Sequence, residues 1–166
     1  MLSTKNLLAI VEKQKELDSA IISAKQLKSD KTIFSKKIVA LLVELGEFIN
    51  EERSFKYWSA KPASEKKVLL EEFIDGIHFI ISIGINLDYD FVSYQFAPVV
   101  KNTIDLYLYC YAQIAIFSKK QSTNNFKVVL DGYFSIAKCL GFTESELLTA
   151  YNEKNEVNLK RQDSNY

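Results

Sequence analysis

The sequence contains few of the residues that interrupt regular secondary structure. Only five glycines and two prolines occur among 166 residues. Between them, apolar side chains recur at intervals of three and four residues, which is the period of the α-helix. The sequence therefore predicts an all-α protein, a bundle of about five to six helices.

Cysteine is also scarce, with Cys110 and Cys139 as its only occurrences. Neither has a second thiol or a histidine at metal-ligand spacing, which argues against a zinc site and against a disulfide framework. Both lie in apolar surroundings along the sequence. We expect both to be reduced residues of the core.

Long apolar runs and an excess of charge are lacking as well. Residues 1–6 have no positively charged start before an apolar stretch, and polar residues interrupt each later apolar run before it reaches membrane-spanning length. The 21 basic and 21 acidic side chains cancel, so no global field favours nucleic acid or an anionic membrane as a partner. We expect a cytoplasmic protein that binds neither.

One domain, residues 1–166, is the expected organisation, because a chain of this size with 48% hydrophobic residues can bury one core. The Thr143-Glu144-Ser145-Glu146 segment has the pattern of a capping box. The residues from about 156 to 166 are expected to form a polar tail that orders on substrate binding. Helices are predicted at about 4–28, 33–53, 64–85 and 89–117, with a fifth ending near Gly141 and a short sixth after Thr143.

Two pairs of acidic residues lie on helix faces that apolar residues also occupy. Glu44 and Glu47 border the apolar stripe of the second predicted helix, and Glu72 and Asp75 lie on the apolar face of the third. A carboxylate near apolar surface is costly unless it is protonated, paired with a cation or bound to a metal. Four such groups point to one shared cause.

The connection between these two helices is short, so they should be antiparallel and the two i, i+3 pairs should face each other. Four converging carboxylates, with no thiolate or imidazole among them, suit Mg²⁺, which commonly links protein carboxylates to substrate phosphates. This arrangement favours phosphoryl chemistry. The alternative is two solvated helix faces, because these spacings also occur by chance in helical proteins.

Three blocks of the sequence follow a known pattern. They are Glu-Leu-Gly-Glu at 44–47, Phe-Lys-Tyr-Trp at 55–58 followed by Glu-Phe-Ile-Asp-Gly-Ile-His-Phe at 72–79, and Tyr151-x-x-Lys154-Asn155-x-x-Asn158-x-x-Arg161-Gln162. Together they resemble the dimeric dUTPases, members of the all-α nucleotide pyrophosphohydrolase superfamily that also includes MazG-like proteins. The resemblance runs from residue 14 to 162 and fades between about 86 and 124. It implies a homodimer that hydrolyses dUTP, and as an open possibility dUDP, with dUMP and pyrophosphate as products of dUTP.

The resemblance also implies a role for each acidic residue. Glu44, Glu47, Glu72 and Asp75 would hold Mg²⁺ on the phosphate chain. Glu47 would in addition activate the attacking water. No covalent enzyme intermediate is needed for this reaction.

Further residues are implied as substrate contacts. Trp58 would pack near the uracil ring, and Gln14 would hydrogen-bond its edge, which suits an amide because it both donates and accepts. Asp18 occupies a position where the family pattern has asparagine. His78 would meet the 3′-hydroxyl of the deoxyribose or serve as an ordinary structural histidine. The predicted phosphate contacts are Lys56, Lys154 and Arg161, with Asn155 and Asn158 closing the tail over the substrate.

Three other interpretations stay open. A di-iron carboxylate bundle shares the acid-x-x-His element of Asp75 to His78, but it requires two such elements and the chain has one histidine. A pyrophosphatase for another nucleotide would use the same metal site and differ around Gln14 and Trp58. A helical interaction module would bind a regulatory protein through the aromatic 89–117 segment, which is otherwise expected to support the homodimer.

Overall fold

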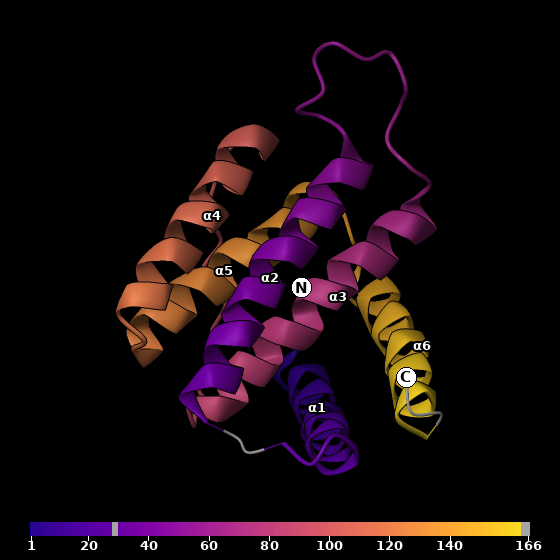
Figure 1. Cartoon of the computed structure of the whole chain (residues 1–166). Coiled ribbons are helices and arrows are strands. Elements are labelled where there is room, and N and C mark those ends of the chain that lie inside the picture. Colours follow the sequence, from indigo (N-terminus) through magenta and orange to yellow (C-terminus); the bar gives the residue numbers. More distant parts are fainter. Residues whose placement is uncertain (28–29, 164–166) are drawn as a thin grey trace.

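The computed structural model describes residues 1–27 and 30–163, which form helices and no strand (Figure 1). This confirms the predicted all-α class and helical bundle. Within the described residues, no helix is both long enough and apolar enough to cross a bilayer. The helices are α1 (Thr4–Ala24), α2 (Lys31–Glu52), α3 (Lys66–Asn86), α4 (Thr103–Lys119), α5 (Thr123–Cys139) and α6 (Glu144–Asp163).

Most helices begin where a short polar side chain accepts hydrogen bonds from the backbone N–H groups of the first helical turn. Asp30 accepts from two N–H groups at the start of α2, and Ser3, Asn102 and Ser122 cap α1, α4 and α5. The predicted capping box of α6 is confirmed. The Thr143 N–H donates to Glu146 Oε2 at 2.9 Å, and the Glu146 N–H donates to Thr143 Oγ1 at 3.2 Å.

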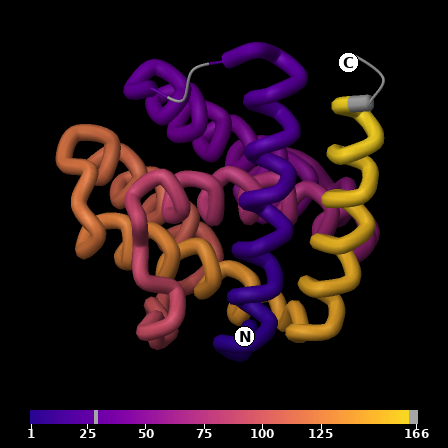
Figure 2. Tube along the Cα trace, turned by 90° about the horizontal axis from the view of Figure 1, so that it is seen from below, coloured from indigo at the N-terminus to yellow at the C-terminus, as the bar shows by residue number. Residues whose placement is uncertain are grey.

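Helix α3 is the centre of the bundle, because α1, α2, α5 and α6 all pack against it. Figure 1 shows α4 and α5 on one side of the α2–α3 pair and α1 and α6 on the other. Figure 2 shows α1 and α6 side by side and running in the same direction, although they come from opposite ends of the sequence. The space between α1, α2, α3 and α6 is therefore enclosed by elements that are distant along the chain.

The predicted fourth helix starts at Thr103 and not near residue 89, so the prediction was wrong for this segment. Residues 87–102 are irregular, and α5 side chains satisfy their polar groups. Asp131 accepts from the Tyr94 hydroxyl at 2.9 Å and from the Ala97 N–H at 3.1 Å, and the Ser135 hydroxyl accepts from the Val99 N–H at 2.9 Å. These tertiary hydrogen bonds replace the helical ones that the apolar period had suggested.

Helix α6 is also longer than expected, because it continues to Asp163. The predicted polar tail from about residue 156 is thus helical up to residue 163, and its last three residues lie outside the described ones. Helix α1 ends at Ala24, earlier than the predicted limit at residue 28, which itself lies outside the described residues. Cys110 is buried as expected, whereas Cys139 is exposed.

Gly76 allows α3 to approach α5 closely. A Cβ atom at this position would lie 1.9 Å from the Tyr133 hydroxyl oxygen, and that hydroxyl donates to the Phe73 carbonyl at 3.1 Å. The Phe73 and Tyr133 rings lie 4.7 Å apart, and both residues are fully buried. This contact fixes the turn of α3 that carries Glu72 and Asp75.

We expect Gly76→Ala to lower the free energy of unfolding by about 1–3 kcal/mol, because the added methyl group forces Tyr133 out of its buried position. The urea midpoint of unfolding, followed by circular dichroism, measures this loss. Gly46→Ala is the matched control, since a Cβ atom there meets only the half-buried Tyr111 hydroxyl at 3.1 Å. Equal midpoints for the two variants would contradict the proposed constraint.

Candidate active site

Three carboxylates from two helices converge on one point. Glu44 of α2 and Glu72 and Asp75 of α3 each offer a carboxylate oxygen, and these oxygens all lie within 4.8 Å of one another. They meet because the two helices are antiparallel and the i, i+3 spacing places Glu72 and Asp75 on one face. We call these three residues the acidic cluster. All three are half-buried.

Burial and mutual repulsion both act against the charged forms of the acidic cluster. Burial raises the pKa of Glu44 to about 7, and the charges of Asp75, Glu47 and Glu72 contribute to this rise. Burial likewise raises the pKa of Glu72 and of Asp75. A cation bound among these oxygens would relieve the repulsion. Because the ligands are hard oxygens without a thiolate or imidazole, the cluster fits a divalent ion such as Mg²⁺.

Lys154 of α6 brings a positive charge to the cluster. Its Nζ atom lies 2.6 Å from Asp75 Oδ2 and 3.2 Å from Glu71 Oε1, and only 13% of its side chain is exposed. Burial alone would lower the pKa of Lys154, but the hydrogen bonds and charges of Asp75 and Glu71 raise it overall. The lysine therefore stays charged and offsets part of the repulsion within the acidic cluster.

A cavity of about 510 Å³ opens between α1, α2, α3 and α6. One part of its lining is charged, and includes Glu44, Glu47, Asp75, Lys154 and Arg161. The other part is largely apolar and includes Leu17, Ile21, Ile22, Leu27, Ile33 and Phe79. A cavity with these two regions suits a ligand that carries phosphates at one end and a flat ring at the other.

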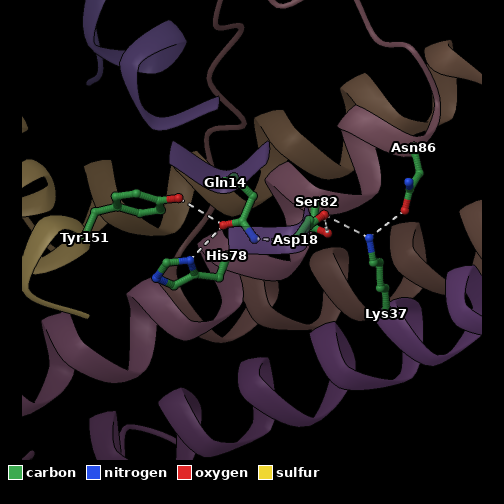
Figure 3. A network of polar contacts seen from close by, with 7 residues as sticks. All are labelled: Gln14, Asp18, Lys37, His78, Ser82, Asn86 and Tyr151. Atoms are coloured by element: carbon green, nitrogen blue, oxygen red, sulfur yellow. Dashed lines mark hydrogen bonds and ion pairs between the residues drawn. The ribbon is translucent and has the colours of Figure 1, made fainter. Parts of the chain in front are cut away.

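A network of polar side chains borders this cavity (Figure 3). Five of its members line the cavity, namely Gln14, Asp18, Lys37, His78 and Ser82. Gln14 Nε2 donates to Asp18 Oδ1 at 2.8 Å, which fixes the orientation of the Gln14 amide. Gln14 Oε1 therefore faces two groups, the Tyr151 hydroxyl at 2.9 Å and His78 Nδ1 at 2.8 Å. An amide oxygen can only accept, so the proton of His78 lies on Nδ1.

His78 is consequently a neutral hydrogen-bond acceptor at its other nitrogen. Burial lowers the pKa of His78 to about 4, and the ring stacks on Tyr151 with centroids 4.4 Å apart. Nε2 is buried and has no partner among the described residues. A buried acceptor beside the cavity can accept from a ligand hydroxyl group that displaces the side chains covering it.

The structure brings most of the predicted site residues together. Glu72 belongs to the acidic cluster, and Glu47 lies outside it but lines the same cavity. Besides Glu44, Glu47 and Asp75, the predicted residues that line the cavity are Gln14, Asp18, His78, Lys154, Asn158 and Arg161. Asn155 is buried and does not line it. The structure thus gathers most of the predicted residues around one cavity.

Lys56 and Trp58 lie elsewhere, in the loop at residues 53–65 that we call the aromatic loop. This loop extends beyond the end of α2, away from α1 (Figure 1). Trp58 is 65% exposed, and the Lys56 ammonium donates to the Asn50 side chain at 2.6 Å. Neither residue lines the cavity of the same chain.

Lys37 and Ser82 are among the cavity residues that sequence reasoning missed. The Lys37 Nζ atom lies 3.0 Å from Asp18 Oδ2, to which the Ser82 hydroxyl also donates. A signal was present, because Lys37 precedes Glu44 by seven residues and Ser82 follows Asp75 by seven. That interval places each residue on the same helix face as the carboxylate, two turns away.

Comparison with known proteins identifies the family of the chain. The family described as dUTPase matches residues 6–166, nearly the whole chain. No curated protein matches the chain significantly. Enzymes of this family generally use a divalent metal ion, for which the acidic cluster offers ligands. The chain belongs to the all-α dUTPase family and is a dUTP diphosphatase, an enzyme that hydrolyses dUTP to dUMP and pyrophosphate.

Proposed function

We propose that this dUTP diphosphatase works with Mg²⁺ held by the acidic cluster together with Glu47. The observation that carries the proposal is the convergence of Glu44, Glu72 and Asp75 within 4.8 Å beside a cavity of about 510 Å³. Burial and the neighbouring carboxylates raise the pKa of Glu44 to about 7, and the charge of Lys154 lowers it only in part, so a cation bound in the cluster would stabilise the charged carboxylates. Octahedral Mg²⁺ is commonly bound by a few carboxylates and by substrate phosphates, which this geometry allows.

Glu47 is the candidate base. It lies three residues after Glu44 on α2, lines the cavity, and its charge raises the pKa of Glu44. It is exposed, outside the tight cluster, and can therefore hold a water molecule next to the substrate and accept its proton. Bound Mg²⁺ would neutralise the triphosphate and stabilise the charge on the leaving pyrophosphate.

The lining of the cavity supports one orientation of the nucleotide. The phosphates would lie at the charged end, where Lys154 and Arg161 meet them, with Asn158 beside Arg161 on α6. The deoxyribose would lie next to His78, whose Nε2 accepts from the 3′-hydroxyl. The base would occupy the apolar end, against Phe79 and Leu17.

We further propose that the enzyme is a homodimer. Helix α4 exposes an apolar face with Ile104, Leu108 and Ile116, and the neighbouring α2 exposes Val39 and Val43. An apolar surface that spans two helices is rarely left in solvent. A second copy packed there offers its own aromatic loop, which would bring Lys56 and Trp58 to a nucleotide that the loop of the same chain does not reach.

The first experiment measures pyrophosphate release from dUTP, dTTP, dCTP and UTP, each with Mg²⁺ and with EDTA. We expect turnover of dUTP with Mg²⁺ and none with EDTA. Glu47→Gln should keep the shape of the site and lose about 10²- to 10⁴-fold in turnover. Glu16→Gln, an exposed acidic residue outside the cavity, is the matched control.

Three results would count against this assignment. Turnover of another nucleotide in preference to dUTP would contradict the substrate assignment. Full activity in EDTA would contradict the proposed dependence on Mg²⁺. Wild-type turnover by a folded Glu47→Gln variant would exclude Glu47 as the base. Thermal unfolding of each variant shows whether it is folded.

Magnesium binding should depend on pH through Glu44. Its folded-state pKa of about 7 lies above the ordinary value of 4.5, so the charged carboxylate destabilises the metal-free fold above neutral pH and less so as the pH falls. Mg²⁺ must displace this proton below neutral pH. The rise in melting temperature on adding Mg²⁺ should therefore be larger at about pH 8 than at about pH 6. An equal rise in melting temperature at both pH values in the wild type would refute the role of Glu44. A rise in Glu44→Gln as large as that in the wild type would also refute it.

The dimer proposal predicts that Leu108→Glu gives a monomer, because it places a charge in the centre of the apolar face. Sedimentation velocity measures the mass of the particle in solution. Val100→Glu, at a position that is 91% exposed and outside α4, should leave the dimer intact. A wild-type protein that sediments as a monomer would contradict the proposal directly.

A further inference from the structure

Lys154 lies in the wall between two cavities. One is the cavity of about 510 Å³ described above, and the other, of about 700 Å³, opens between α3 and α6. Lys154 lines both of them. Among the described residues, Asp75 lines the first cavity and not the second, whereas Glu71 lines the second and not the first. The ammonium group is therefore held between two carboxylates that belong to different cavities.

The two carboxylates offer Lys154 neighbouring positions. Glu71 and Asp75 are four residues apart on α3, so their side chains lie one turn from each other on the same face. The Lys154 Nζ atom lies 2.6 Å from Asp75 Oδ2 and 3.2 Å from Glu71 Oε1. The Asp75 side chain is 18% exposed and that of Glu71 is 57% exposed. The shorter contact is thus made with the more buried carboxylate.

Asp75 is required by two different cations. It belongs to the acidic cluster, whose oxygens fit a divalent ion, and it is also the closer partner of Lys154. Two cations at one partly buried carboxylate repel each other, because the surroundings screen their charges only weakly. Lys154 in its present position therefore opposes the binding of a metal ion. Glu71 is outside the acidic cluster and offers the lysine another acceptor.

We propose that Glu71 is a positioning residue, which receives the Lys154 ammonium when a divalent cation is bound by the acidic cluster. This proposal rests on the metal site proposed above. The lysine needs only a small rotation, because Nζ is already within hydrogen-bonding distance of both carboxylates. A largely buried ammonium without a carboxylate partner would be costly. With Glu71 as its partner, Lys154 stays charged beside the site, and Asp75 is released for the cation.

Glu71 could also act in a simpler way, as one more negative charge that attracts any cation nearby. The two roles differ in their dependence on Lys154. A general attraction is present whether or not the lysine is there. A role as the alternative acceptor disappears when the lysine is replaced, so the effects of the two substitutions would be coupled.

The test measures the affinity for Mg²⁺ alone, by calorimetry on the full-length protein at about pH 8. Glu71→Gln should weaken binding by about three- to fivefold, because Lys154 is then left with Asp75 as its acceptor. Lys154→Met keeps the aliphatic stem, removes the competing charge and should tighten binding by about tenfold or more. In the Lys154→Met background, Glu71→Gln should change the affinity by less than about twofold.

Glu153→Gln is the matched control. Glu153 precedes Lys154 on α6, is exposed and lines the same second cavity as Glu71, but it does not pair with Lys154 in the described part of the chain. It removes the same charge and should leave the affinity nearly unchanged. Turnover gives a second readout, since the free Mg²⁺ concentration for half-maximal hydrolysis of dUTP should rise in Glu71→Gln and not in Glu153→Gln. Thermal unfolding in EDTA shows whether each variant is folded.

The outcomes separate this proposal from the proposed function. Equal weakening by Glu71→Gln with Lys154 present or replaced, in a protein that binds Mg²⁺, would overturn the transfer of the lysine and leave the metal site intact. Weaker binding of Mg²⁺ by folded Lys154→Met would overturn the transfer as well. Absence of Mg²⁺ binding in every folded protein would overturn the metal site itself, and the transfer with it. If Lys154→Met fails to fold, equal effects of Glu71→Gln and Glu153→Gln would overturn the role of Glu71.

Discussion

Repulsion among half-buried carboxylates is the constraint on which the rest of this structure depends. Glu44, Glu72 and Asp75 are held within 4.8 Å of one another, and burial together with their neighbours' charges raises the pKa of Glu44 to about 7. Such an arrangement disfavours the fold unless the helices are fixed by other contacts. Those contacts lie directly behind the cluster, where Phe73 packs on Tyr133 and Gly76 leaves room for its hydroxyl. The core packing of α3 thus offsets a cost that the acidic cluster imposes.

A hydrogen-bond network beside the cavity holds a second group of helices together. Tyr151 of α6 and Gln14 of α1 meet His78 of α3 in one network, so three helices from distant parts of the sequence are tied at a single level. The hydrogen bond from Gln14 to Asp18 orients the Gln14 amide, and the Gln14 oxygen then requires a proton on His78 Nδ1. His78 Nε2 is therefore an acceptor. A polar network of this kind specifies orientation more strictly than apolar contacts do. In the nucleotide orientation proposed above, it lies where the sugar and base would bind.

The sequence predicted those features that depend on local periodicity. The all-α class, the capping box at Thr143 and the convergence of Glu44 with Glu72 and Asp75 all follow from spacing along one or two adjacent helices. It failed where tertiary contacts override the period. Residues 87–102 leave the helix because Asp131 and Ser135 of α5 accept their hydrogen bonds. Helix α6 extends through polar residues because Tyr151 and Asn155 are buried against the bundle, which its weak apolar pattern does not reveal.

Lys37 shows why part of the site was out of reach of sequence reasoning. A lysine on a helix is ordinarily a solvated side chain, and only the position of α1 across the cavity makes Lys37 the partner of Asp18. The same holds for Lys154, whose contact with Asp75 requires α6 to pack beside α3. Both lysines place a positive charge next to an acidic residue in an otherwise neutral chain, one at each end of the cavity. The equal numbers of basic and acidic residues, 21 of each, therefore do not reveal that these opposite charges are paired along one cavity.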